Sequence, residues 1–218
     1  MIRTRFAPSP TGPLHIGGLR TALFNFLFAK QNNGKFLLRI EDTDKERSKK
    51  EWEKEIFNAL KQLDLNWDNE IERQSERGEV YKKYLEKMLK QGTAYYCFCT
   101  KEELEIEKEA LKKRGKAPVH QGKYRNLKLE EALKKGGNPV IRFKCPQNKE
   151  IIFNDLIRGK IKISTTDIGD FIIAKNLDTP LYNFTCVVDD YEMKITHIIR
   201  GEEHIPNTPK QILLGEAL

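Results

Sequence analysis

The chain has 218 residues and a net charge of +7, because 39 lysines and arginines outnumber 32 acidic residues. This length allows one large domain or one domain that carries an insertion. No apolar run approaches the roughly 20 residues that cross a membrane, and the N-terminal residues lack the apolar segment of a secretory signal. We therefore expect a cytoplasmic protein with no membrane contact and no disulfides, and the positive charge favours a polyanionic partner.

The first thirty residues predict a strand, a turn and a helix. Residues 1–7 alternate loosely as a strand does, and three prolines and a glycine between positions 8 and 13 then force a turn. Apolar residues recur at helical spacing from position 19, so a helix should begin just after His15. The N–H groups at a helix start attract phosphate, Gly17 and Gly18 permit close approach, and His15 adds a donor. This turn is predicted to bind an anion or a nucleotide.

A second strand is predicted over residues 36–40, which are mostly apolar. Strand, helix and strand within about forty residues form a βαβ unit, the basis of a doubly wound parallel sheet. Glu41, Asp42 and Asp44 follow this strand, at the sheet edge where such folds bind ligands. Solvated turn residues are the alternative interpretation of these acids.

The rest of the sequence predicts a change from amphipathic helices to a mixed α+β segment in the middle of the chain. Amphipathic helices are expected over residues 46–66 and around residues 80–89. Charged helices then alternate with β-like runs, which is typical of an α+β segment; they cover residues 101–114, 129–135, 139–144, 150–153 and 155–163. Near the end we expect a strand over Ile195–Ile199 and a helix that Asn207 or Thr208 caps, with Pro209 in its first turn.

Three motif blocks, in order, resemble those of glutamyl-tRNA synthetases, which are class I aminoacyl-tRNA synthetases. They are P-S-P-T-G-P-L-H-I-G-G from Pro8, R-I-E-D-T-D from Arg39, and the C-terminal block D-F-I-I…V-V-D-D…R-G-E-E-H from Asp170. The resemblance covers essentially the whole chain. It implies an α/β fold with a Rossmann-like doubly wound parallel sheet, split by an α+β insertion that binds the tRNA acceptor end.

The same resemblance implies a division of the chain into three segments. Residues 1–93 would form the first half of the nucleotide-binding catalytic domain, 94–168 the insertion, and 169–218 the start of the second half. The lysine-rich loop that closes over ATP in this family would lie beyond Leu218, as would the anticodon-binding region. We therefore expect the N-terminal catalytic part of a longer enzyme, with slow turnover in the absence of that loop.

The resemblance further implies a ligase that attaches L-glutamate to tRNA-Glu. Glutamate attacks the α-phosphate of ATP, which carries Mg²⁺, and the resulting glutamyl-adenylate is transferred to the terminal ribose of the tRNA. Catalysis in this scheme needs positioning and stabilisation of charge on the phosphates, and no protein nucleophile. We expect the enzyme to act as a monomer.

Candidate site residues follow from the resemblance and from the chemistry of the substrates. The catalytic group is expected to comprise His15, Gly17 and Gly18. Arg5 and Arg200 are candidates for the glutamate carboxylates because arginine binds carboxylates bidentately, and Arg200 could instead pair with a neighbouring glutamate. Glu41 would bind the ammonium group. The glutamate site is completed by Ala7, Ser9 and Tyr182; the ATP site comprises Thr11, Gly12, His15, Gly17 and Glu203; Asp44 would lie near the tRNA 3′ end.

Cys97 and Cys99 have a spacing that suits a metal only if further ligands arrive. Some members of the family bind zinc through such a pair and two residues about two dozen positions later. Here Tyr124 stands where a third cysteine would be, and His120 is the other substitute. The candidate metal set is therefore Cys97, Cys99 and Tyr124. Because tyrosine keeps its proton to about pH 10, the sequence favours a thiol pair without metal over a Zn²⁺ site.

Three other functions fit parts of the sequence. A glutamyl-queuosine tRNA-Asp synthetase shares this core, but it usually reads P-S-P-S-G and has a shorter insertion. A nucleotidyltransferase that makes dinucleotide cofactors would not need R-I-E-D-T-D or R-G-E-E-H. A non-catalytic RNA-binding fragment would account for the charge alone.

Overall fold

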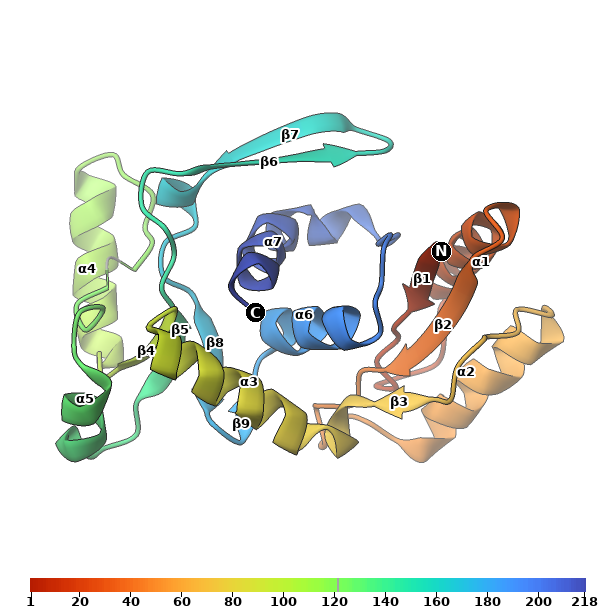
Figure 1. The fold of residues 1–218 in the computed structure, drawn as a ribbon, viewed down its shortest axis with the longest axis horizontal. Helices are drawn as coiled ribbons and strands as arrows, with labels where there is room; N and C mark the ends of the chain where they lie inside the picture. The colour runs from red at the N-terminus through yellow and green to blue at the C-terminus, as the bar shows by residue number, and fades with distance from the viewer. Residues whose placement is uncertain (121) are drawn as a thin grey trace. The chain divides into compact units, whose positions relative to one another are not determined.

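The computed structural model describes residues 1–120 and 122–218 (Figure 1). The chain forms two compact units, each assembled from two separate stretches: residues 1–78 with 189–204, and residues 79–188 with 205–218. The three segments expected from the family resemblance are a different division, and they stay a prediction. Across the described residues, none of the helices combines the length and the apolar character that crossing a membrane requires.

The first unit contains a three-stranded parallel sheet in the order β1-β2-β3. Its elements are β1 (Arg3–Phe6), α1 (Ile16–Gln31), β2 (Lys35–Ile40), α2 (Lys50–Gln62) and β3 (Glu72–Arg73). Strands and helices alternate along the chain, so the predicted βαβ unit and the α/β class are confirmed. Figure 1 shows α1 alongside β1 and β2, which it connects.

The two faces of this sheet carry different residues because side chains alternate along a strand. One face packs against α1 and α2 in an apolar core formed by Phe6, Ala22, Ala29, Phe36, Leu38, Ile56, Leu60 and Leu65. The alternate positions Arg5, Leu37 and Arg39 are buried on the other face. There the sheet meets residues 189–204, which begin with the end of helix α6 (Tyr182–Glu192). The sheet therefore buries an apolar face and a charged face.

Two expectations for the first unit need correction. Helix α2 is shorter than residues 46–66: it ends at Gln62, and Leu63 just beyond it is exposed. Residues Ile195–Ile199 do not form a strand. Thr196 N–H does bond to Arg3 O at 3.0 Å, but Arg3 N–H is taken by the Thr196 hydroxyl at 2.9 Å. A side chain thus replaces the backbone acceptor, and no ladder of backbone bonds follows.

The second unit is built on an antiparallel sheet in the order β4-β5-β8-β9. These strands are β4 (Ala94–Cys97), β5 (Val140–Phe143), β8 (Ile172–Asn176) and β9 (Thr179–Pro180). Apolar residues of the sheet form one core with α3 (Gly78–Gln91), α6 and α7 (Thr208–Ala217). Asn207 precedes α7 but makes no capping bond, since the 3-10 segment Glu202–Asn207 leads into the helix and keeps that residue helical. The predicted helix start and the place of Pro209 in the first turn are confirmed, and the expected side-chain cap from Asn207 is wrong.

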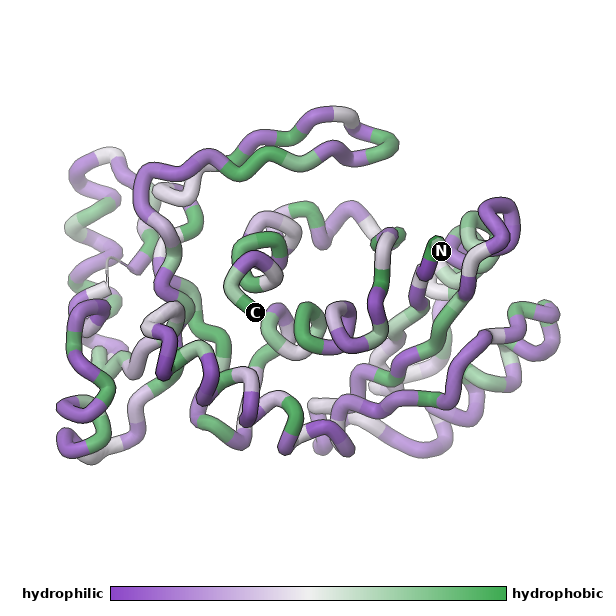
Figure 2. The backbone as a smooth tube through the Cα atoms, in the orientation of Figure 1, coloured by the Kyte–Doolittle hydropathy of each residue, from purple (hydrophilic) through white to green (hydrophobic). Residues whose placement is uncertain are grey.

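The rest of the second unit is charged and more exposed. It comprises α4 (Lys101–Lys113), α5 (Leu129–Lys135), and the hairpin of β6 (Glu150–Asp155) and β7 (Gly159–Ser164). Thr100 and Glu103 form a reciprocal capping box at the start of α4, which fixes its first turn. Leu156 and Ile157 are exposed at the tip of the hairpin, where the tube is green in Figure 2.

Candidate functional site

Helix α1 begins at the histidine of the first motif. His15 is the N-cap residue: its backbone is extended and its Nδ1 atom accepts a hydrogen bond from the Gly17 N–H at 3.0 Å. A neutral imidazole that accepts at Nδ1 carries its proton on Nε2, so this exposed ring presents a donor. A Cβ on Gly18 would come within 2.9 Å of Leu14 Cδ1. The Gly18 N–H donates to His15 O at 2.8 Å, so the histidine closes the first turn. The helix start thus combines a ring donor with the positive end of the helix dipole.

The loop between β1 and α1 is tied to the segment that follows β2. The Glu41 N–H donates to Pro8 O at 3.0 Å, and the Lys49 N–H donates to Pro10 O at 3.0 Å. These bonds hold the loop at the carboxyl ends of two parallel strands, where such sheets bind ligands. The loop carries four of the predicted ligand residues, Ala7, Ser9, Thr11 and Gly12.

Charged side chains gather on the second face of the sheet. Asp190 Oδ1 lies 3.1 Å from Arg5 Nε and 2.8 Å from Arg39 Nη1. Arg39 Nη2 in turn lies 3.1 Å from Glu41 Oε1. We call Arg5, Arg39, Glu41, Asp189 and Asp190 the arginine–carboxylate cluster. It brings together two residues predicted to bind glutamate, Arg5 and Glu41.

Asp189 extends this cluster toward the end of the first unit's sheet. Its Oδ1 accepts from Arg77 Nε at 2.8 Å, its Oδ2 accepts from Gln74 Nε2 at 2.7 Å, and Arg39 Nε lies 3.6 Å away. Sequence reasoning missed Arg39, Asp189 and Asp190. Each is a charged residue within an otherwise apolar run, F-L-L-R-I or F-T-C-V-V-D-D, and that contrast was the available signal.

Burial and ion pairing oppose each other in the cluster. Burial raises the pKa of Glu41 above its usual value, and Arg39 and Arg5 offset this only in part. Burial would also raise the pKa of Asp190, but Arg5 and Arg39 outweigh it and the pKa is lowered. Asp190 is therefore held as a carboxylate, whereas Glu41 sits where a bound cation would stabilise its ionised form.

Arg200 lies in the same region of the first unit. Burial lowers the pKa of His204, and the positive charges of Arg200 and Arg5 lower it further. Glu203 opposes the shift and places its Oε1 3.6 Å from His204 Nε2. Both arginines thus act electrostatically on the imidazole that Glu203 contacts.

Two predicted residues lie elsewhere. Asp44 is half-buried and precedes the turn at residues 45–47, where its carboxylate accepts from Arg47 Nε at 2.6 Å, and this bond lowers the pKa of Asp44. Tyr182 is the first residue of α6 and belongs to the second unit. Both assignments stay predictions.

A possible metal centre lies in the second unit. The ligand atoms of Cys97, Cys99 and His120 all lie within 4.8 Å of one another, and Cys97 Sγ is 3.6 Å from His120 Nε2. Burial would raise the pKa of Cys97, but His120 and nearby donors lower it to about 7. His120 Nδ1 lies 2.6 Å from Glu107 Oε2. Tyr124 packs its ring edge-on against Phe98, with centroids 5.4 Å apart.

The 3.6 Å between Cys97 Sγ and His120 Nε2 fits a tetrahedral zinc site. Bonds of roughly 2.3 Å to sulfur and 2.0–2.1 Å to nitrogen place neighbouring ligand atoms about 3.5–3.8 Å apart. A carboxylate on the far nitrogen of a metal-bound histidine is the usual second partner that orients the ring, and Glu107 occupies that place.

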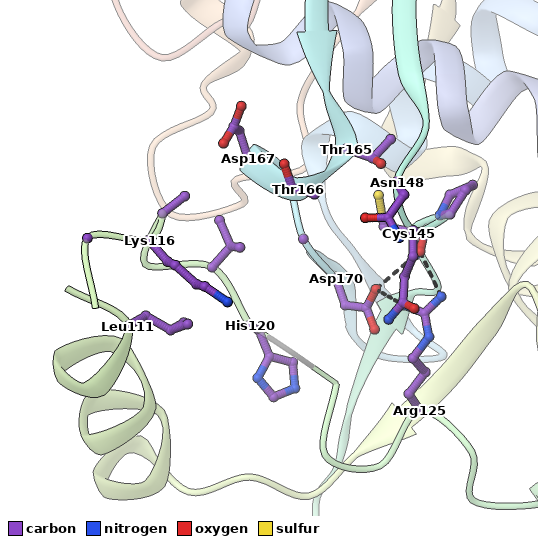
Figure 3. Close-up of a pocket in the computed structure, with 16 residues that line it drawn as sticks. Leu111, Lys116, His120, Arg125, Cys145, Asn148, Thr165, Thr166, Asp167 and Asp170 are labelled. Carbon is purple, nitrogen blue, oxygen red and sulfur yellow. Dashed lines mark hydrogen bonds and ion pairs between the residues drawn. The ribbon is translucent and has the colours of Figure 1, made fainter. Parts of the chain in front are cut away.

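A pocket of about 550 Å³ lies beside this centre (Figure 3). Asp170 Oδ1 accepts from Arg125 Nη1 at 2.6 Å and from the Cys145 N–H at 2.9 Å, and Asp170 Oδ2 accepts from Tyr95 OH at 2.8 Å. Arg125 also donates to Cys145 O at 2.7 Å. These groups saturate one another, so the pair joins the loop after α4 to the sheet and is structural.

A parallel βαβ unit whose glycine-rich helix start carries a histidine cap defines an α/β domain of the nucleotide-binding class. The family model for class I tRNA synthetases of the glutamate and glutamine type, catalytic domain, matches residues 1–218. The chain therefore belongs to this family.

Relatives give the same result. The chain is 54% identical to a glutamate–tRNA ligase of Carboxydothermus hydrogenoformans, covering 100% of this chain and 48% of that protein, and 57% identical to one of Aquifex aeolicus, covering 100% and 46%. A crystal structure of a glutamate tRNA ligase from Elizabethkingia meningosepticum, in complex with its amino acid, superposes with a TM-score of 0.86 at 42% identity, covering 99% of this chain and 47% of that one. The chain thus spans about half the length of these relatives.

Proposed function

We propose that this chain supplies the glutamate- and ATP-binding part of a glutamate–tRNA ligase. The observation that carries the proposal is the arginine–carboxylate cluster of the first unit, in which Asp190 and Arg39 link Arg5 to Glu41. Arg200 belongs to the same unit and lowers the pKa of His204 together with Arg5. Two guanidinium groups and one carboxylate match the two carboxylates and one ammonium group of glutamate. The family membership and the names of the relatives support the same substrate.

ATP would bind with its phosphates at the start of α1. The positive end of the α1 dipole and the Nε2–H of His15 would stabilise the charge that builds on the α- and β-phosphates as glutamate attacks. Mg²⁺ bound to the ATP would neutralise further phosphate charge. Gly17 and Gly18 would allow the phosphates to approach the backbone, with Thr11, Gly12 and Glu203 around the nucleotide.

Selectivity for glutamate over glutamine would come from the arginines. A guanidinium that binds a carboxylate bidentately would face an NH₂ group if glutamine entered, and it would then lose a partner. Ala7, Ser9 and Tyr182 would complete the amino-acid site. Asp44 would lie near the tRNA 3′ end, and the basic balance of the chain would favour tRNA-Glu as the polyanionic partner.

We also propose that Cys97, Cys99 and His120 bind a structural Zn²⁺. The close approach of their ligand atoms and the Glu107–His120 hydrogen bond support this site. It would fasten the end of β4 to the segment that follows α4. Tyr124 stays a candidate for the fourth ligand.

The experiment that tests the main proposal is ATP–pyrophosphate exchange with the full gene product. Exchange should require glutamate and should be absent with glutamine. Transfer of glutamate to tRNA-Glu, compared with tRNA-Asp that carries queuosine, separates the ligase from the glutamyl-queuosine alternative. Exchange without glutamate, or transfer only to tRNA-Asp, would contradict the proposal.

A further inference from the structure

In the arginine–carboxylate cluster, one oxygen atom of Asp190 links the guanidinium groups of Arg5 and Arg39. Asp190 Oδ1 is within 3.1 Å of Arg5 Nε and 2.8 Å of Arg39 Nη1, so a single carboxylate oxygen bonds both guanidinium groups. The side chain of Arg39 is 0% exposed and that of Arg5 is 5% exposed. At such sites water does not compete, and a charge-assisted hydrogen bond fixes the direction of both partners.

The bond at Arg5 is made through Nε rather than through a terminal nitrogen. Because the guanidinium group is planar, a hydrogen bond at Nε sets the plane in which its two Nη groups lie. The direction in which Arg5 faces a ligand therefore depends on where Asp190 sits. Asp190 itself is fixed at the end of α6, where its carbonyl accepts from the Ile195 N–H at 2.8 Å.

Asp190 reaches Glu41 by a second route. Arg39 Nη1 bonds Asp190 and Arg39 Nη2 bonds Glu41 Oε1 at 3.1 Å, so the same guanidinium group spans the two carboxylates. Asp189 steadies this bridge from the Nε side at 3.6 Å. Without Asp190, Arg39 would lose one of the carboxylates that balance its buried charge.

We propose that Asp190 is a positioning residue of the glutamate site: it orients Arg5 directly and Glu41 through Arg39, and it touches no substrate. This role rests on the proposed function. A charge-balancing role without positioning would require only that a negative charge be present, whereas positioning requires these two hydrogen bonds. Loss of positioning should weaken glutamate binding and spare ATP binding, whereas loss of charge balance should weaken the binding of both ligands.

The test is calorimetric titration of L-glutamate and of ATP into the chain and its Asp190→Asn variant. We expect glutamate affinity to fall roughly tenfold to a hundredfold, in the range of coupling within one hydrogen-bonded network, and ATP affinity to stay within about twofold. Asp68→Asn is the matched control: Asp68 accepts from the Phe36 N–H at 2.8 Å in the same unit but lies outside the cluster. It should leave both affinities unchanged. Equal losses for glutamate and ATP in Asp190→Asn would overturn the positioning role.

A double-variant cycle with Arg5→Gln tests the route of action. If Asp190 acts through Arg5, the loss caused by Asp190→Asn should shrink several-fold once Arg5 has been replaced. Strict additivity would overturn the direct route. If Arg5→Gln alone leaves glutamate affinity intact, or the unchanged chain binds no glutamate, the assigned glutamate site is wrong and the positioning role falls with it. If only Asp190→Asn is silent, the proposed function stands and this inference fails.

Discussion

His15 Nδ1 accepts a hydrogen bond from the Gly17 N–H at 3.0 Å, so the histidine of the first motif is also the cap of helix α1. Capping and phosphate binding are two roles for the two nitrogens of one ring. The cap occupies Nδ1 and thereby fixes the proton on Nε2, the atom left to meet a phosphate. The two roles can be separated by substitution.

We expect His15→Ala to lower glutamate-dependent ATP–pyrophosphate exchange by about 10²–10³-fold in the full gene product, because a donor to the developing phosphate charge is lost. His15→Asn should lower it similarly. Asparagine is a good N-cap residue, so this variant should keep the stability that His15→Ala loses, about 1 kcal/mol of unfolding free energy. Exchange rates and urea unfolding on the same preparations give both quantities. Normal exchange in His15→Asn would show that His15 acts only as a cap.

Zinc binding should depend on Cys97, Cys99 and His120. We expect purified chain to carry about one zinc per molecule, and Cys97→Ser and His120→Ala to lose it, because each removes a ligand. Cys145→Ser is the matched control: this thiol is also buried, burial raises its pKa to about 11, and it lies outside the ligand cluster. Elemental analysis after dialysis measures the result. Zinc retained in Cys97→Ser would rule out this centre.

Asp170→Asn should destabilise the second unit by roughly 3–5 kcal/mol, because it leaves the guanidinium of Arg125 without its carboxylate in a buried setting. Asp167→Asn, an exposed acid on the wall of the same pocket, should change stability by less than about 0.5 kcal/mol. Urea unfolding monitored by tyrosine fluorescence or circular dichroism compares the two. Equal effects would mean that the Arg125–Asp170 pair contributes no more than a surface charge.

Stability toward acid should depend on Asp190. Its pKa is lowered in the folded chain, so its contribution is fully present above the unfolded value of about 3.9 and is lost as the pH falls through the folded pKa. Glu41 acts oppositely, because its raised pKa makes protonation favour the folded state. We expect wild-type stability to decline between pH 5 and pH 3 more steeply than that of Asp190→Asn. Parallel declines would show that Asp190 does not titrate as described.

The local sequence pattern was enough to predict much of the secondary structure of the first unit. The prolines before His15, the apolar period of α1 and the run at β2 each act within a few residues, and the structure has all three elements. The strand expected at Ile195–Ile199 failed because its outcome depended on a distant partner: Thr196 takes the Arg3 N–H with its side chain. Such a choice between side chain and backbone has no periodic signal.

The candidate site likewise contains residues that the local sequence predicts and residues that depend on distant partners. The helix-start residues follow from the first motif, but Asp190, which bonds Arg5, lies 185 positions away along the chain. The sequence makes His120 a candidate substitute for a third cysteine, and only the fold places its Nε2 3.6 Å from Cys97 Sγ. Long-range pairing, which the sequence pattern alone does not specify, decided both.

The discontinuity of the first unit has a consequence for how it forms. Residues 79–188 must leave the ribosome before Asp189 and Asp190 can reach Arg5 and Arg39. At bacterial or eukaryotic elongation speeds of roughly 5–20 residues per second, the delay is on the order of ten seconds. During that interval the nascent sheet presents arginines with no carboxylate partner from α6. Completion of the sheet's charged face is therefore a late event in biosynthesis, set by translation rather than by local folding.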